Sequence, residues 1–149
     1  MASLMSNKFR TLLLNNGIDL LNNTIKVMLV QASYTPDKDH NFVDSITGGT
    51  TKEISGTGYT GGFAGSGRKT LASKAVAQDD TNDIGWFDAA DLVWTALDAG
   101  TVGYAVVIKE VASDADSIII CVHDVSPDVV SNGGNYTVQW AADGVLKLA

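Results

Sequence analysis

Six glycines fall within twelve residues of one segment, Ser55–Leu71, whose sequence is SGTGYTGGFAGSGRKTL. Glycine-rich turns can cradle phosphates with their backbone N–H groups, so this segment is the first candidate for chemistry. It contains a formal G-x-G-x-x-G at Gly56, Gly58 and Gly61. It also comes close to a phosphate loop, with Arg68 at the position where that loop requires lysine.

Neither pattern has the flanking elements that nucleotide binding requires. Both need a buried strand before the glycines and a helix after them. Residues 50–55 form at most a short polar strand, and three more glycines follow within six residues of Gly61. Each glycine would cost a helix about 1 kcal/mol. We therefore predict a turn-rich loop between strands, with nucleotide binding as the alternative.

The histidines and the single cysteine do not form a recognisable catalytic or metal-binding pattern. Cys121 and His123 are two residues apart in a strand-like segment, so they share a face. A nucleophilic Cys–His pair needs its members on separate elements that face each other, so we predict a buried thiol beside a histidine at the end of a strand. His40 lies in a polar stretch and is interpreted as an exposed loop residue. Zinc would need more Cys or His ligands in compact spacing.

Aspartates are concentrated in one stretch of the chain, at Asp79, Asp80, Asp83, Asp88 and Asp91. An EF-hand loop needs glycine at its sixth position, and counting from Asp79 places Ile84 there. The EF-hand is therefore excluded. We interpret the aspartates as turn formers in a solvated loop, and an irregular calcium site is the alternative.

Length and composition indicate one folded domain. The chain has 149 residues, 45% of them hydrophobic, and a formal net charge of −7. That charge, with no basic cluster beyond Arg68 and Lys69, argues against nucleic-acid binding. The apolar runs are too short to span a bilayer or to form a signal peptide, so we expect a soluble protein made in a cytoplasm. With one cysteine, no intrachain disulfide can form.

Hydrophobic periodicity predicts one short helix followed by strands. Phe9, Leu12 and Leu13 recur at helical spacing after the potential N-cap Ser6 or Asn7, which predicts a helix near 7–15. Strands are predicted at 24–32, 71–78, 85–88, 92–97, 103–110, 117–123, 135–140 and 145–148, the last two joined in a hairpin through Asp143-Gly144. A long loop-rich region fills 33–70. This pattern predicts a mainly β fold, an antiparallel β-sandwich or barrel-like single domain over 1–149, with one short N-terminal helix.

The aromatic residues divide into two groups by context. Those in strand patterns are predicted to lie in the core: Trp86, Phe87, Trp94, Tyr104, Tyr136 and Trp140. Tyr34, Tyr59 and Phe63 lie in loops rich in glycine or proline, where exposed aromatics favour binding to another protein. We therefore name these three as candidate interface residues.

The order of several sequence blocks resembles a family of tailed-bacteriophage virion structural proteins. The blocks extend over nearly the whole chain and read IDLLNNTIKVMLVQASYTPDKDHNF, EISGTGYTGG, KTLASKAV, FDAADLVW, GYAVVIKE and NYTVQWAADGVLKL. In this family the second block marks a loop between strands and passes almost directly into the third. Here residues 63–68 intervene, so the shape of this loop departs from the family pattern.

The resemblance implies a non-enzymatic virion protein without catalytic residues, cofactor or bound metal. It implies a cement or decoration protein on the capsid surface, synthesised in the host bacterial cytoplasm, that binds the major capsid protein and itself, as a homotrimer. Nucleic acid and membrane are not among the implied partners. The alternative is a tail-, neck- or fibre-associated protein, with host-surface binding as one possible role.

Overall fold

The computed structural model describes residues 3–149 and is built mainly from antiparallel strands. One helix, α1 (Asn7–Leu14), precedes most of the strands, and a single-turn helix, α2 (Asp44–Thr47), lies in the region between β2 and β3. The strands are β1 (Ser3–Met5), β2 (Ile25–Gln31), β3 (Lys69–Thr70), β4 (Ala75–Asp79), β5 (Ile84–Asp88), β6 (Leu92–Leu97), β7 (Thr101–Lys109), β8 (Ile118–Val130), β9 (Gly134–Val138) and β10 (Leu146–Leu148). The predicted mainly β, sandwich-like fold with a short N-terminal helix is confirmed.

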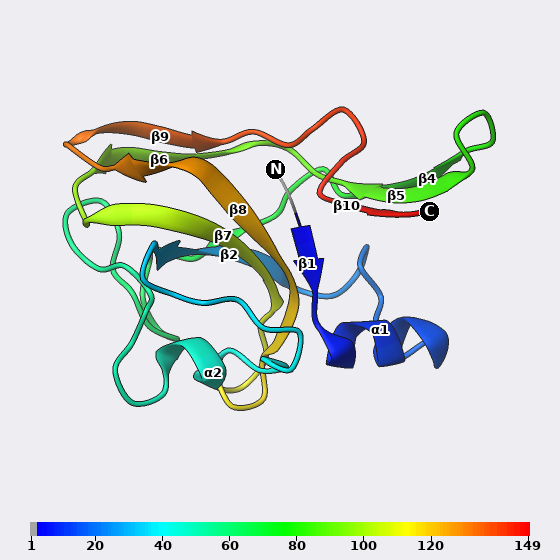
Figure 1. Ribbon diagram of the computed structural model, residues 1–149, viewed down its shortest axis with the longest axis horizontal. Helices are drawn as coiled ribbons and strands as arrows, with labels where there is room; N and C mark the ends of the chain where they lie inside the picture. The colour runs from blue at the N-terminus through cyan, green and yellow to red at the C-terminus, as the bar shows by residue number, and fades with distance from the viewer. Residues whose placement is uncertain (1–2) are drawn as a thin grey trace.

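Three sheets make up the molecule (Figure 1). The largest has the order β1-β8-β7-β2-β3, and a second has the order β10-β5-β4. The third is the two-stranded pair β6-β9. In Figure 1 the β4-β5-β10 sheet lies on the same side of the molecule as α1, and the turn between β4 and β5 projects beyond that sheet.

The five-stranded sheet is buried on both faces. On one face the side chains of β2, β7 and β8 pack with β6, β9, Phe9 of α1 and Phe87 of β5 in the main core. On the other face they pack against Tyr34, Val43 and Ile46, which come from the segment that contains α2. This two-sided burial explains why the central strands are continuously apolar in sequence instead of alternating.

The N-terminal helix forms where its sequence predicts. The Ser6 side chain accepts a hydrogen bond from the N–H of Phe9, 3.1 Å away, and so caps the first turn. The Ser6 hydroxyl also donates to the carbonyl of Ile119, which ties the cap to β8. Phe9 is buried, whereas Leu14 at the last turn is 90% exposed.

Two strand predictions are wrong in a way that changes the connectivity. The strand expected at 71–78 forms only from Ala75 onward, as β4, because Ser73 adopts a positive φ of 53° where the chain divides β3, in the large sheet, from β4, in the small one. The hairpin expected through Asp143-Gly144 contains a turn there, but β10 pairs with β5 and not with β9. Burial of Leu146 beside Phe87 accounts for that choice.

Other elements match the predictions closely or extend them. The strands predicted at 24–32, 85–88, 92–97, 103–110 and 135–140 correspond to β2, β5, β6, β7 and β9. The strand predicted at 117–123 continues to Val130. The short elements β1, β3 and α2 had no sequence signal that we recognised. None of the helices in residues 3–149 is long and apolar enough to cross a membrane.

Candidate functional site

The glycine-rich segment is packed against the protein body. Gly56 pairs with Tyr59 and Thr57 with Asp98 through backbone hydrogen bonds. A Cβ at Gly58 would lie 2.6 Å from the carbonyl oxygen of Ala96, so the backbones touch where only glycine fits. The segment leads into the two-residue strand β3 and not into a helix. The predicted loop between strands is confirmed, and the segment lacks the helix N-terminus that would hold a phosphate.

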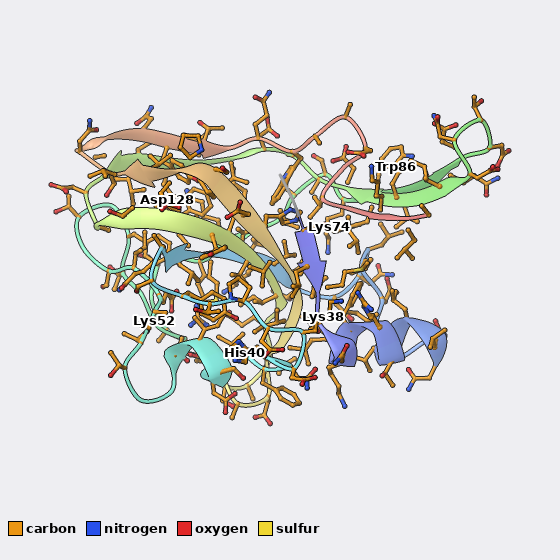
Figure 2. All side chains as sticks on the ribbon, in the orientation of Figure 1. Lys38, His40, Lys52, Lys74, Trp86 and Asp128 are labelled. Atoms are coloured by element: carbon orange, nitrogen blue, oxygen red, sulfur yellow. The ribbon has the colours of Figure 1, made fainter. Side chains whose placement is uncertain are left out.

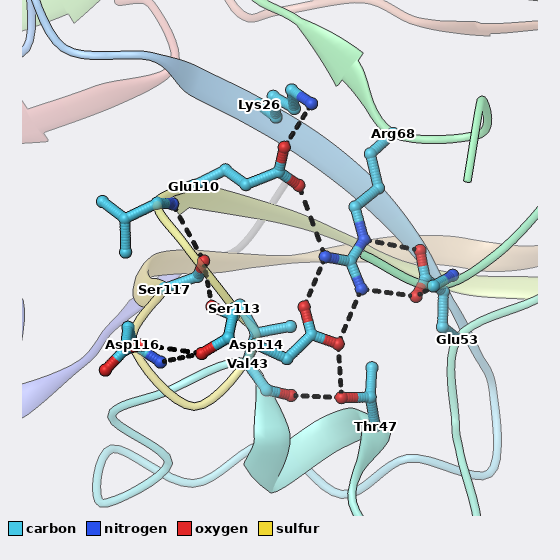
Figure 3. A network of polar contacts seen from close by, with 12 residues as sticks. Lys26, Val43, Thr47, Glu53, Arg68, Glu110, Ser113, Asp114, Asp116 and Ser117 are labelled. Atoms are coloured by element: carbon cyan, nitrogen blue, oxygen red, sulfur yellow. Dashed lines mark hydrogen bonds and ion pairs between the residues drawn. The ribbon is translucent and has the colours of Figure 1, made fainter. Parts of the chain in front are cut away.

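The residue that stood out as a mismatch to the phosphate loop, Arg68, is the centre of a buried ionic cluster (Figure 3). Its guanidinium is completely buried and donates two hydrogen bonds to Glu53, from Nε to Oε1 at 2.9 Å and from Nη2 to Oε2 at 2.8 Å. It donates two more to Asp114, at 2.6 and 3.1 Å, and one to Glu110 at 3.4 Å. Glu110 also pairs with Lys26 of β2. We call these five residues the Arg68 network.

Glu53 is satisfied from several directions. Besides Arg68, its carboxylate accepts hydrogen bonds from the Tyr59 hydroxyl at 2.8 Å and from the Gly62 N–H at 2.9 Å. The Tyr59 hydroxyl in turn accepts a hydrogen bond from the N–H of Leu29 at 3.0 Å. The Arg68 network therefore joins the glycine-rich segment to β2 and, through Asp114, to the turn between β7 and β8.

The surroundings keep Arg68 and Asp114 of the Arg68 network charged, and they keep the hydroxyl of the neighbouring Tyr59 protonated. Burial opposes ionisation of Asp114, but hydrogen bonds from Arg68 and Thr47 lower its pKa below the ordinary value. Burial also opposes the charge of Arg68, and the hydrogen bonds to Glu53 and Asp114 outweigh it and raise the pKa of the guanidinium. For Tyr59, desolvation and the neighbouring Glu53 raise the pKa of the phenol, so the hydroxyl stays a donor.

This arrangement is unsuited to binding an anion. The five N–H groups of the Arg68 guanidinium are directed at carboxylates. Three carboxylates, those of Glu53, Glu110 and Asp114, would also repel a phosphate. The geometry therefore assigns the Arg68 network to holding the fold together, and the sequence patterns at Gly56–Gly61 and near Gly67 do not build a nucleotide site.

The predicted buried thiol at Cys121 beside His123 is confirmed, but His123 lies in the middle of β8 and not at the end of a strand, because β8 continues to Val130. Both are buried on β8, with the Cys121 Sγ 3.4 Å from the His123 Nε2. Burial raises the pKa of the Cys121 thiol to about 12 and lowers the pKa of His123 to about 4. The thiol is therefore protonated and the ring neutral near pH 7, which is unlike an activated nucleophile with its base. A hollow of about 230 Å³ adjoins His123 and Trp140.

The remaining histidine lies in a loop, and of the aspartates Asp80 and Asp83 lie in the β4–β5 turn, while Asp79 ends β4 and Asp88 ends β5, so Asp88 is not the loop residue that was predicted. His40 is half-buried, not exposed as predicted, since its Nδ1 is hydrogen bonded to the Tyr34 hydroxyl at 2.8 Å. Asp79 accepts hydrogen bonds from Thr81 and Asn82 and so shapes the β4–β5 turn. Within residues 3–149, no three His, Cys, Asp or Glu side chains are grouped so that they could hold a metal ion.

Of the three candidate interface aromatics, the structure exposes one. Tyr59 is 1% exposed and Tyr34 lies in the second core, so the expectation that these two are exposed loop residues is wrong. Both rings are buried because their hydroxyls find partners, Glu53 and His40. Phe63 is 39% exposed, so a contact role for it stays a prediction.

Among the aromatics assigned to the core, half are fully buried. Phe87, Trp94 and Trp140 are buried, whereas Trp86, Tyr104 and Tyr136 are half-buried. Trp86 lies on the small sheet, as Figure 2 shows.

An apolar groove, which the sequence did not reveal, lies between α1 and the small sheet. It has a volume of about 160 Å³ and is lined by Leu13, Leu20, Val76, Gly85, Phe87 and Leu148. The lining comes from three separate parts of the chain, so no single sequence window contains it. The one signal in the sequence was the run Thr11-Leu-Leu-Leu14, which carries more leucines than a single buried helix face needs.

Comparison with protein-family models, with curated proteins and with solved structures finds no match for this chain.

Proposed function

We propose that this chain is a non-enzymatic structural protein of a bacteriophage virion that binds the assembled capsid shell and stabilises it as a cement protein. The observation that carries the proposal is the division between charged and apolar groups in the fold. The buried charges of the glycine-rich segment neutralise one another within the Arg68 network. Among the exposed large apolar side chains, in contrast, Leu14 belongs to α1, Leu21 to the segment after it, and Val76 and Leu148 to the small sheet.

That division is what a binding module requires. A catalytic site keeps reactive groups accessible and tuned, whereas here Cys121, His123 and Arg68 are buried and inactivated by their surroundings. A ligand that binds an assembled lattice and not its free subunits stabilises the lattice by mass action. The resemblance of the sequence blocks to virion structural proteins supports the capsid as the lattice, and we propose a homotrimer as the binding form.

The proposal is tested by mixing the purified protein with emptied capsid shells and, separately, with unassembled major capsid protein of the phage that encodes it. We expect saturable binding to shells, visible by electron microscopy as density repeated over the surface, and at least tenfold weaker binding to free subunits. Density only at the tail or neck would favour the alternative role. Absence of the chain from the particle would overturn the proposal.

A further inference from the structure

We propose that the apolar groove is the surface through which copies of this chain meet, with the acidic β4–β5 turn of one copy against the Arg10 side of the next. This inference rests on the self-association part of the proposed function and assigns it to a surface.

The groove is open because the small sheet is only half covered. Strand register places Val76, Phe87 and Leu146 on one face, in adjacent positions across β4, β5 and β10. Phe87 and Leu146 are buried by the body of the protein, but Val76 remains 57% exposed. Further out on the same face Gly85 has no side chain, and a Cβ there would meet nothing within 4 Å. The outer half of the sheet therefore presents an unfilled apolar surface.

Exposed leucines line this surface or directly follow the lining residues Leu13 and Leu20 in the chain. Leu148 of β10 is 46% exposed, and Leu21 is exposed to a similar extent. Leu14 of α1 is the most exposed large apolar residue in the described chain. Single exposed leucines are common on protein surfaces, but a contiguous group around an apolar groove is typical of a contact site.

The charges beside the groove indicate which partner fits. Helical spacing places Arg10 on the same side of α1 as Leu13 and Leu14. No ion pair of Arg10 occurs within residues 3–149. Across the groove, the turn after β4 carries Asp79, Asp80 and Asp83, and these carboxylates likewise have no cationic partner in the described part of the chain.

Neighbouring copies of the chain satisfy the charges on both borders of the groove. A purely acidic or purely basic partner would match one border of the groove and be repelled by the other. In a head-to-tail arrangement, each copy offers its acidic turn to Arg10 of one neighbour and its own Arg10 to the turn of another. The β4–β5 turn projects beyond its sheet (Figure 1), so it can reach a neighbour. Such a head-to-tail contact closes a ring when the rotation allows it, in keeping with a trimer.

The test is sedimentation equilibrium of wild type and of charge-reversal variants. We expect wild type to associate, and Arg10→Glu and Asp80→Lys each to weaken association at least tenfold. The double variant Arg10→Glu/Asp80→Lys should regain most of it, because the reversed pair is again complementary. Lys52→Glu changes the charge by the same amount on the opposite side of the molecule from α1 and the small sheet and should leave association unchanged (Figure 2).

Substitutions of apolar residues test the groove contact independently of its charges, by the same sedimentation measurement. Leu14→Ser should weaken association at least tenfold, whereas Val130→Ser removes another exposed apolar side chain, 70% accessible, at the far end of β8 and should not. A wild-type protein that is monomeric at all concentrations would overturn self-association itself, whatever the result with capsid shells. Association that all the groove variants retain would overturn this surface alone.

Discussion

Two regions of this protein combine charge and apolar surface in opposite ways. In the Arg68 network, charges from distant parts of the chain are buried and paired, and the glycine-rich segment is fixed to the body. At the apolar groove, leucines and a valine remain in solvent, while the neighbouring charges of Arg10 and the β4–β5 turn form no ion pair among residues 3–149. The glycine-rich segment, which is the most prominent motif of the sequence, is therefore part of the folded core. The leucines at the apolar groove, which form no motif, are available for binding.

Removing Arg68 should produce the largest effect. Arg68→Met leaves the Glu53 carboxylate buried without its cation, which typically costs about 3–5 kcal/mol of unfolding free energy. Urea denaturation measures the loss. The double variant Arg68→Met/Glu53→Met should recover part of it, because both buried charges are then gone. If Arg68→Met lowers the unfolding free energy no more than Lys38→Met does on the surface, the Arg68 network does not hold the fold together.

Acidification should destabilise the protein through His123 on β8. Its pKa is about 4 in the folded protein and near 6.5 in the unfolded chain, so the unfolded chain binds the extra proton between those values. Stability should therefore fall as pH drops from about 6.5 to about 4, by up to about 3 kcal/mol. Asp114 has a lowered pKa, so its contribution is lost at lower pH, below its ordinary value of 3.8.

Chemical denaturation between pH 6.5 and 4 measures the contribution of His123 to the loss of stability. His123→Gln should abolish most of the slope between pH 6.5 and 4. An unchanged slope in His123→Gln would show that other groups cause the acid sensitivity.

The Tyr59 hydroxyl should have a measurable but smaller effect. Tyr59→Phe removes the hydrogen bonds to Glu53 and from Leu29 in a buried site, at an expected cost of about 1–3 kcal/mol. Tyr136→Phe is the matched control, since its half-buried hydroxyl has no hydrogen-bond partner among residues 3–149. Equal unfolding free energies for the two variants would contradict a specific role for Tyr59 in fixing the glycine-rich segment.

Groove substitutions should have the smallest effect on the stability of the monomer. Leu14→Ser removes an exposed side chain and is expected to change the unfolding free energy by less than about 0.5 kcal/mol at dilute protein concentration. A much larger loss would mean that Leu14 supports its own fold and would weaken the assignment of this region to binding. Thermal unfolding at low concentration provides the measurement.

The fold class and most strands could be predicted because their signals are local. The alternation of Tyr136, Val138 and Trp140 and the N-cap at Ser6 each act within a few residues. The division at Ser73 and the pairing of β10 with β5 could not be predicted, because they depend on which distant apolar residues need cover.

The sites were harder to predict than the fold for the same reason. Arg68 was visible as a departure from a motif, but its partners Glu53 and Asp114 are 15 and 46 residues away. Tyr59 was expected at the surface because its neighbours are glycines, yet those glycines allow the backbone to approach closely enough to bury the ring. The apolar groove combines side chains from both ends of the chain, and composition alone gives no such grouping.

Hydrogen–deuterium exchange at low and high protein concentration tests the contrast between the two regions most directly. We predict slow, concentration-independent exchange in residues 53–70, which the Arg68 network holds. Residues 10–21, 75–88 and 146–148 around the apolar groove should gain protection as concentration rises. The opposite pattern, with protection gained in 53–70 and none around the groove, would contradict the account.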